Sequence, residues 1–246
     1  MKAELMQSHK VFSSFAAKES SLVFLNGVFQ PELSRFQRLP AGVSLETRDG
    51  FTLRIPDKMV IEDIMHVVLV SDDSAEARQE FAVKVFAGIS SRMNLVVHKA
   101  GDGVFNPKKI VTELRLAEGA CVDYFQLEDS GVRGEFEGEN HFYLKKHAVL
   151  DYLVFAAAEG VSMNRTIVEF EGEHGFFSAK GLSMLHGKSR AEHALTVNHR
   201  APACISRQYY KTVLAGSSKA AFDSLVHVHA GASKSDSHQL NRNLLL

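Results

Sequence analysis

The stretch VLDYLVFAAAEGVSMNRTIVEFEGEHGFFSAKGLSML, residues 149–185, decides the fold of this chain. Apolar and polar residues alternate along it, which is typical of half-buried β-strands, and Gly, Glu and His cluster where the alternation breaks. Strand-like segments begin near six residues: Val149, Met163, Phe176, Ala191, Cys204 and Ala220. This spacing, roughly 13–16 residues, is too short for strand–helix–strand units and predicts a repetitive all-β core.

Two architectures fit the repeat: a β-sandwich and a right-handed parallel β-helix with about two strands per coil. In a β-helix no coil buries its inner face alone, so the stacking of neighbouring coils supplies the core. Val226 and Val228 alternate with His227, as expected for a strand with one buried face. The alternation by itself leaves both architectures open.

The chain before the repeats adds two further parts. Residues 1–20 predict a short amphipathic helix, since Leu5 and Phe12 fall near one helical face. Residues 21–42 contain Pro31, Pro40 and Gly42 and are expected to form a connector and the entry to the core. The β core is expected to span residues 43–246.

Composition restricts the class of protein. The chain has 246 residues, 45% of them hydrophobic, and a net charge of −1, which suits a packed globular protein and gives no bulk electrostatic reason to bind nucleic acid or an acidic membrane. It has only two cysteines, Cys121 and Cys204, which excludes a disulfide-stapled secreted scaffold. No signal peptide is recognisable, and the apolar runs are far shorter than the ~20 residues of a membrane span. We therefore expect a cytoplasmic protein.

Two groups of residues are low-ranking candidates for metal binding or catalysis. His227 and His229 lie on one face of a predicted strand and could bind zinc or iron, although spacing identifies no third ligand. An outward polar face is the plainer interpretation. His199 and Cys204 are close in sequence, so a thiolate beside an imidazole could act as a nucleophile or a ligand. A buried, inert cysteine is the commoner situation.

Alternating carboxylates give a further enzymatic alternative. Glu169, Glu171 and Glu173 could line the acidic groove of a β-helix enzyme that acts on polysaccharide. The absence of tryptophan from the sequence weakens this alternative, because aromatic platforms commonly hold sugars. A metal-binding β-barrel enzyme that uses His227 and His229 is the other alternative. Neither has a self-contained catalytic constellation.

The chain ends on the apolar run Leu244-Leu245-Leu246. Each leucine loses roughly 1.5–3 kcal/mol if it stays in water rather than being buried. We therefore expect either that a partner covers this end, as an interface, or that the natural chain continues.

The last fifth of the chain, from Val197 to Leu246, resembles the SufB/SufD family of iron–sulfur cluster assembly proteins. The resemblance is closest to SufD, and weaker similarity extends back to Phe24-Leu25-Asn26-Gly27. It rests on these motifs: Asn198-His199-Arg200-Ala201-Pro202-Ala203-Cys204, Tyr210-Lys211-Thr212-Val213-Leu214, Gly231-Ala232-Ser233-Lys234-Ser235-Asp236 and Gln239-Leu240-Asn241-Arg242-Asn243-Leu244-Leu245-Leu246.

The resemblance implies a right-handed parallel β-helix and a non-catalytic scaffold subunit. The implied partners are SufB-like subunits and a SufC-like ATPase, with a homodimer when the chain is isolated. The resemblance places an iron–sulfur cluster in the assembled complex, leaves a flavin there open, and assigns no cofactor to this chain alone. The family continues past the leucine run into a cysteine–histidine motif and SufC-binding helices. Those roles therefore cannot be assigned to residues of this sequence.

Overall fold

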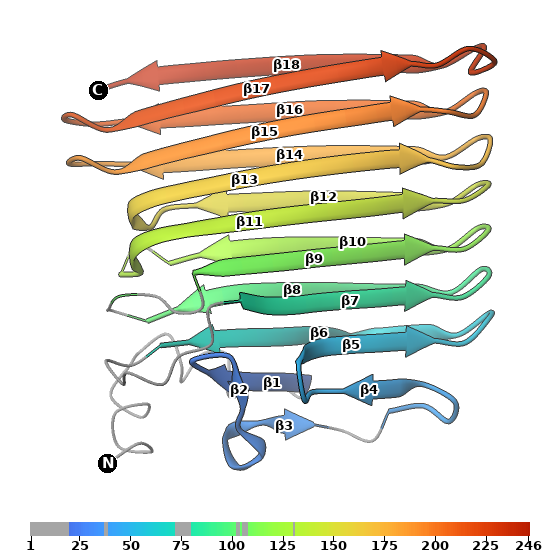
Figure 1. Ribbon diagram of the computed structural model, residues 1–246, viewed down its shortest axis with the longest axis horizontal. Helices are drawn as coiled ribbons and strands as arrows, with labels where there is room; N and C mark the ends of the chain where they lie inside the picture. Colours follow the sequence, from blue (N-terminus) through green and yellow to red (C-terminus); the bar gives the residue numbers. More distant parts are fainter. Residues whose placement is uncertain (1–19, 37–38, 72–79, 102–103, 105–107, 130) are drawn as a thin grey trace.

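The computed structural model describes residues 20–36, 39–71, 80–101, 104, 108–129 and 131–246 (Figure 1). The helix predicted within residues 1–20 lies, except for Ser20, outside the described residues. Ser20 itself begins a strand. The described part consists of β-strands and one 3-10 helix, η1 (Pro31–Leu33).

The strands form two sheets, here called sheet A and sheet B. Sheet A is ten-stranded, and its main path has the order β18-β16-β14-β12-β10-β8-β6-β1-β2. It contains β1 (Ser20–Leu25), β2 (Val28–Phe29), β3 (Arg35–Phe36), β6 (Val60–Val70), β8 (Arg92–Ala100), β10 (Cys121–Glu128), β12 (Val149–Ala156), β14 (Phe176–Leu185), β16 (Ile205–Leu214) and β18 (Asp236–Leu245).

Sheet B is eight-stranded, in the order β17-β15-β13-β11-β9-β7-β5-β4. It contains β4 (Ser44–Glu46), β5 (Gly50–Ile55), β7 (Glu80–Ala87), β9 (Lys109–Leu116), β11 (Arg133–Leu144), β13 (Glu159–Phe170), β15 (Arg190–His199) and β17 (Lys219–Val228). From β5 to β18, successive strands alternate between the sheets, and sheet neighbours are parallel. This is the predicted parallel β-helix (Figure 1), so the sandwich and the β-barrel are both wrong.

The repeat predicted from sequence is confirmed in position. The six segments predicted from Val149 onward correspond to the strands β12 to β17. Within the segment expected as connector and entry to the core, residues 21–42, β1 pairs in parallel with β6 from Ser21↔His66 to Leu25↔Val70. This segment therefore contributes strands to sheet A.

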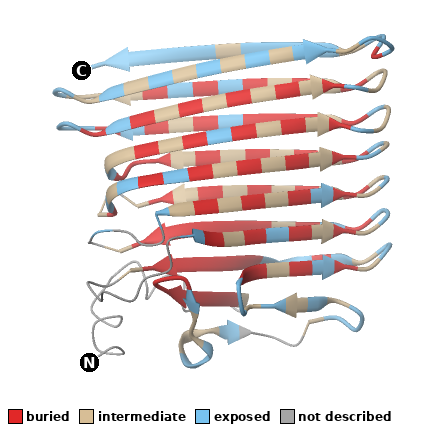
Figure 2. Cartoon of the chain, viewed as in Figure 1, coloured by how far each residue is buried: buried red, intermediate tan, exposed pale blue. Residues whose placement is uncertain are grey.

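Along many strands of the middle coils, buried residues alternate with half-buried or exposed ones (Figure 2), and the buried residues fill the interior. Strands β10 and β12 both follow a strict alternation of half-buried and buried residues. Phe142 of β11 packs edge-on against Tyr124 and Tyr152, with ring centroids 6.0 and 5.3 Å away. Burying an aromatic of this size contributes about 1.5–3 kcal/mol, so stacked aromatics from both sheets hold successive coils together.

The turns that lead from sheet B to sheet A contain residues with a left-handed backbone conformation, in which φ is positive. His147 and His174 have φ of 55° and 60°. The N–H of His147 donates to Glu173 O at 3.0 Å, and that of His174 donates to Pro202 O at 3.1 Å. Each turn therefore bonds to the turn of the next coil. This explains why Gly, His and Lys cluster between the predicted strands, since the turn needs a residue that tolerates this conformation.

Among the described residues, no helix is long and apolar enough to cross a membrane.

Candidate functional site

The last coil, β17 and β18, leaves one end of the β-helix open. These two strands are the terminal members of sheets B and A. Val228 faces inward on β17 but is 54% exposed, and Leu245 of β18 is 74% exposed. Phe222 and Val226 of β17 are only partly buried against the core. The open end therefore combines apolar side chains with strand edges that can accept another β-strand.

The three terminal leucines, which the sequence predicted to form an interface, do not all lie on one face of sheet A. Leu244 pairs with Val213 and Leu245 with Leu214, so their side chains point to opposite faces of sheet A. Leu246 N donates to Leu214 O at 2.8 Å. All three are more than half exposed. The side chain of Leu245 lies on the interior face of sheet A, at the open end, whereas the side chain of Leu244 lies on the outer face.

Cys204 lies in the turn before β16 and is fully buried. Its thiol donates to Gly172 O at 3.2 Å, and burial raises the pKa of the thiol. A buried, protonated thiol is a poor nucleophile and a poor metal ligand. The surroundings of Cys204 therefore favour a packing role.

His199, at the end of β15, is also fully buried. Its Nε2 lies 3.1 Å from Ser206 Oγ, and Ser206 donates onward to Ser237 Oγ at 2.9 Å. The ring packs on Phe170 with centroids 4.7 Å apart, and burial lowers the pKa of the imidazole. His199 and Cys204 thus have separate hydrogen-bond partners, and the geometry assigns them no shared chemistry. The hydrogen-bonded chain from His199 leads to the exposed Ser237 on the last coil.

His227 and His229 do come together, as the sequence predicted. Their rings stack with centroids 3.9 Å apart at the end of β17. His229 Nε2 lies 3.5 Å from Asn198 Oδ1, and Asn198 Nδ2 donates to Glu169 Oε1 at 2.8 Å. Partial desolvation and the neighbouring His227 lower the pKa of His229. Within the described residues, no three His, Cys, Asp or Glu side chains gather as metal ligands, so this pair is an outer polar face rather than a formed metal centre.

The carboxylates considered for polysaccharide cleavage are held in ion pairs. Glu169 accepts from Arg200 at 2.6 Å. Glu171 pairs with Lys145 at 2.8 Å, and Glu173 pairs with Lys146 at 2.7 Å. The hydrogen bond from Lys146 lowers the pKa of Glu173. A general acid needs a raised pKa, so this arrangement is unlike the carboxylate pair of a glycosidase.

Sequence reasoning missed a polar network inside the β-helix. Tyr152 donates to Gln126 Oε1 at 2.5 Å, Gln126 donates to Asn140 Oδ1 at 3.0 Å, and Asn140 donates to Thr166 Oγ1 at 3.1 Å. These four residues belong to β12, β10, β11 and β13, so the network joins both sheets across successive coils. Its only sequence signal is that polar residues occupy positions in the buried phase of the alternation.

Two more buried polar groups lie at the end of the coil where sheet A leads into sheet B. Lys99 Nζ lies 2.8 Å from Glu128 Oε1, with both side chains at least 94% buried. Ser162 donates to the same carboxylate oxygen at 3.2 Å. His193 Nε2 lies 3.0 Å from Ser183 Oγ, and burial lowers the pKa of this histidine to about 4.

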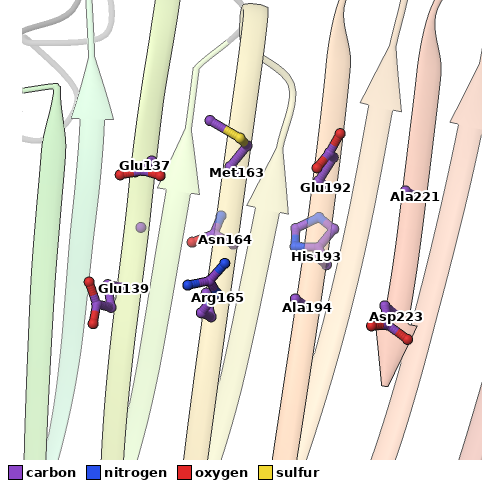
Figure 3. Close-up of a pocket in the computed structure, with 11 residues that line it drawn as sticks. Glu137, Glu139, Met163, Asn164, Arg165, Glu192, His193, Ala194, Ala221 and Asp223 are labelled. Carbon is purple, nitrogen blue, oxygen red and sulfur yellow. The ribbon is translucent and has the colours of Figure 1, made fainter. Parts of the chain in front are cut away.

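The outer face of sheet B carries a groove of about 270 Å³ (Figure 3). Carboxylates of Glu137, Glu139, Glu192 and Asp223 surround it, with Arg165 at its centre. Hydrogen bonds from Lys109 and His141 lower the pKa of Glu139 to about 2. Part of the negative charge is therefore already neutralised within the chain. The buried side chains of Asn164 and His193 also line the groove, and Asn164 Nδ2 is buried without a hydrogen-bond partner.

Comparison with models of known protein families finds a match over most of the chain. A family model described as "SUF system FeS cluster assembly, SufBD core domain" matches residues 70–246. This match covers the coils from the end of β6 to β18. No curated protein matches the chain.

Proposed function

Because the chain belongs to the SufBD core family of the SUF iron–sulfur cluster assembly system, we propose that it acts as a SufD-like, non-catalytic scaffold subunit. The proposed partners are a SufB-like subunit and a SufC-like ATPase in the cytoplasm, and the iron–sulfur cluster is the cargo of the complex. The observation that carries the proposal is the family match combined with an open coil end that exposes Val228 and Leu245.

The pairing surface we propose is this open end. Two β-helices that meet there would extend both sheets and bury Phe222, Val226, Val228 and Leu245, which the last coil leaves partly or mostly exposed. Strand edges add main-chain hydrogen bonds to such a contact. In the absence of a SufB-like subunit, a second copy of this chain is the expected occupant, since an isologous contact uses the same surface twice.

Co-expression tests the proposal. The chain should co-purify with a SufB-like subunit, and alone it should form a dimer in light scattering coupled to size exclusion. Val228→Asp should weaken either association by more than about tenfold, because a carboxylate would be desolvated in the contact. Leu225→Asp is the matched control: Leu225 is 59% exposed on the same strand but faces outward. Association that survives Val228→Asp unchanged, or is lost equally with Leu225→Asp, would contradict the proposed surface.

A SufC-like ATPase provides the second readout. If the chain is a scaffold, it should bind neither nucleotide nor polysaccharide, and the ATPase activity of the complex should depend on the SufC-like subunit alone. Hydrolysis that persists in the purified chain, and is lost on substitution of one of its own residues, would make it an enzyme.

A further inference from the structure

The two outer faces of the β-helix differ in chemistry. Sheet B presents mostly charged side chains to solvent, among them those of the groove in Figure 3. Sheet A presents a diagonal apolar band, which we define as Leu153, Phe155, Leu182, Met184, Val213 and Leu244. Met184 is 48% exposed and Leu244 is 54% exposed, while the other four are half-buried.

The register of sheet A makes this band continuous. Phe155 lies beside Leu182, and Met184 lies beside Val213, which lies beside Leu244. Neighbouring strands are about 4.8 Å apart, so from β12 to β18 the band is roughly 14 Å long. Sheet faces that meet only water normally carry polar residues, and a continuous apolar band on one face indicates a contact surface.

Three cations follow one side of the band. Lys180 is the register partner of Leu153, Lys211 is that of Leu182, and Arg242 is that of Lys211. Lys180 has the carboxylate of Asp151 at 3.4 Å, whereas Lys211 lies over the ring of Tyr209 at 5.2 Å. All three are exposed, and they occupy the successive strands β14, β16 and β18.

We propose that the diagonal band is a docking site for an amphipathic helix with acidic residues along one flank of its apolar stripe. Side chains three or four apart on a helix lie about 5–6 Å from one another. This is close to the spacing of neighbouring strands, which separates Lys211 from Arg242, whereas Lys180 lies opposite Tyr209, two residues before the position of Lys211. A helix of about ten residues spans the band. Charge complementarity selects this occupant over an isologous contact with a second copy of the chain, which would bring the same cations to the band.

The site is distinct from the proposed pairing surface. The band is on the outer face of sheet A, and Met184 and Lys211 belong to strands that precede the last coil. Docking there would let the β-helix hold a helical partner while its open end pairs with another β-helix. Substitutions at Met184 and Lys211 therefore report on the band and leave the open end intact.

The test uses the full chain and two fluorescein-labelled helical peptides with the same leucine stripe, one flanked by glutamate and the other by lysine. In fluorescence anisotropy the glutamate peptide should bind at least about tenfold more tightly, and Met184→Glu or Lys211→Glu should each weaken it about tenfold. Lys211→Glu should at the same time strengthen binding of the lysine peptide. Leu225→Glu and Lys219→Glu, on the outer face of sheet B, should change neither.

Three results would overturn the proposal. The first is equal affinity of both peptides for every variant. The second is loss of self-association, in sedimentation equilibrium, on substitution of Met184, which would make the band a contact between copies. The third is binding to phosphatidylserine vesicles that Lys211→Glu abolishes, which would make it a lipid surface. If Met184→Glu does not fold, as judged by circular dichroism, the charge exchange at Lys211 decides the question alone.

Discussion

His193 should make the β-helix less stable as the pH falls below about 6.5, and the substitution His193→Gln should remove this contribution. The side chain is 7% exposed, and its Nε2 lies 3.0 Å from Ser183 Oγ. Burial is the largest cause and lowers the pKa of His193 to about 4. Glu128 raises the pKa, and Lys99 lowers it. In the unfolded chain an imidazole titrates near 6.5, so protonation below that pH favours unfolding.

The size of the effect follows from the two pKa values. Above pH ~7 the histidine is neutral in both states and contributes no pH dependence. Between about 6.5 and 4 only the unfolded chain takes up the proton, which costs about 1.4 kcal/mol per pH unit and about 3 kcal/mol in total at pH 4. Domains commonly have about 5–15 kcal/mol of net stability, so this single residue could decide whether the protein survives mild acid.

The assay is urea unfolding followed by far-ultraviolet circular dichroism from pH 4 to pH 8, on the natural sequence and on His193→Gln. Glutamine can keep a hydrogen bond to Ser183 but does not titrate in this range. The difference in unfolding free energy between the two proteins should be constant above pH 7 and shift by about 3 kcal/mol in favour of the variant by pH 4. The other histidines cancel in this difference. Parallel curves over the whole range would refute the reasoning, and His193→Phe provides a second comparison if glutamine prevents folding.

Three further predictions follow from the interior. Glu128→Leu leaves the ammonium of Lys99 buried without its carboxylate and should lower the unfolding free energy, measured in urea, by about 3–5 kcal/mol. The double variant Glu128→Leu with Lys99→Met should recover most of this loss. A double variant no more stable than the single one would contradict this. Gly181→Ala would place a Cβ 2.1 Å from Cδ1 of Tyr210, so it should destabilise by about 1–3 kcal/mol, and an unchanged urea midpoint would show that the ring moves freely. Cys204 is fully buried and Cys121 is partly exposed, so Ellman's reagent should modify Cys121 first and should reach Cys204 in Cys121→Ser only as the chain unfolds.

The coil repeat could be predicted from the sequence because it depends on local properties. Strand β15 alternates Ala191, His193, Leu195 and Val197 with more polar residues, and the turn after it contains Pro202 and Ala203. Both signals lie within about a dozen residues and need no knowledge of distant contacts. The choice of a parallel β-helix over a sandwich did not follow from these signals, because strand direction depends on which segments pair.

The polar interior could be predicted only in part. His193 and His199 occupy the buried phase of β15, so their inward direction was available from the alternation. Their partners were not: Ser183 comes from β14 and Ser206 from β16, and only the stacking of coils brings them within hydrogen-bond distance. The pair His227 and His229 was found for the opposite reason, since two outward residues on one strand are neighbours whatever the fold.

The polar network solves a problem of register that apolar packing leaves open. In a stack of parallel strands, a slip of one residue exposes the core, but a slip of two keeps every apolar side chain inside. The bonds of Gln126 to Tyr152 and Asn140, and of Asn140 to Thr166, exist only in one register. A slip of two would leave buried amides unpaired, at about 1–3 kcal/mol for each group. The network therefore fixes the register of the middle coils and, through them, that of the last coil. Another β-helix can continue both sheets only if the edge strands of the last coil, β17 and β18, are in register with each other.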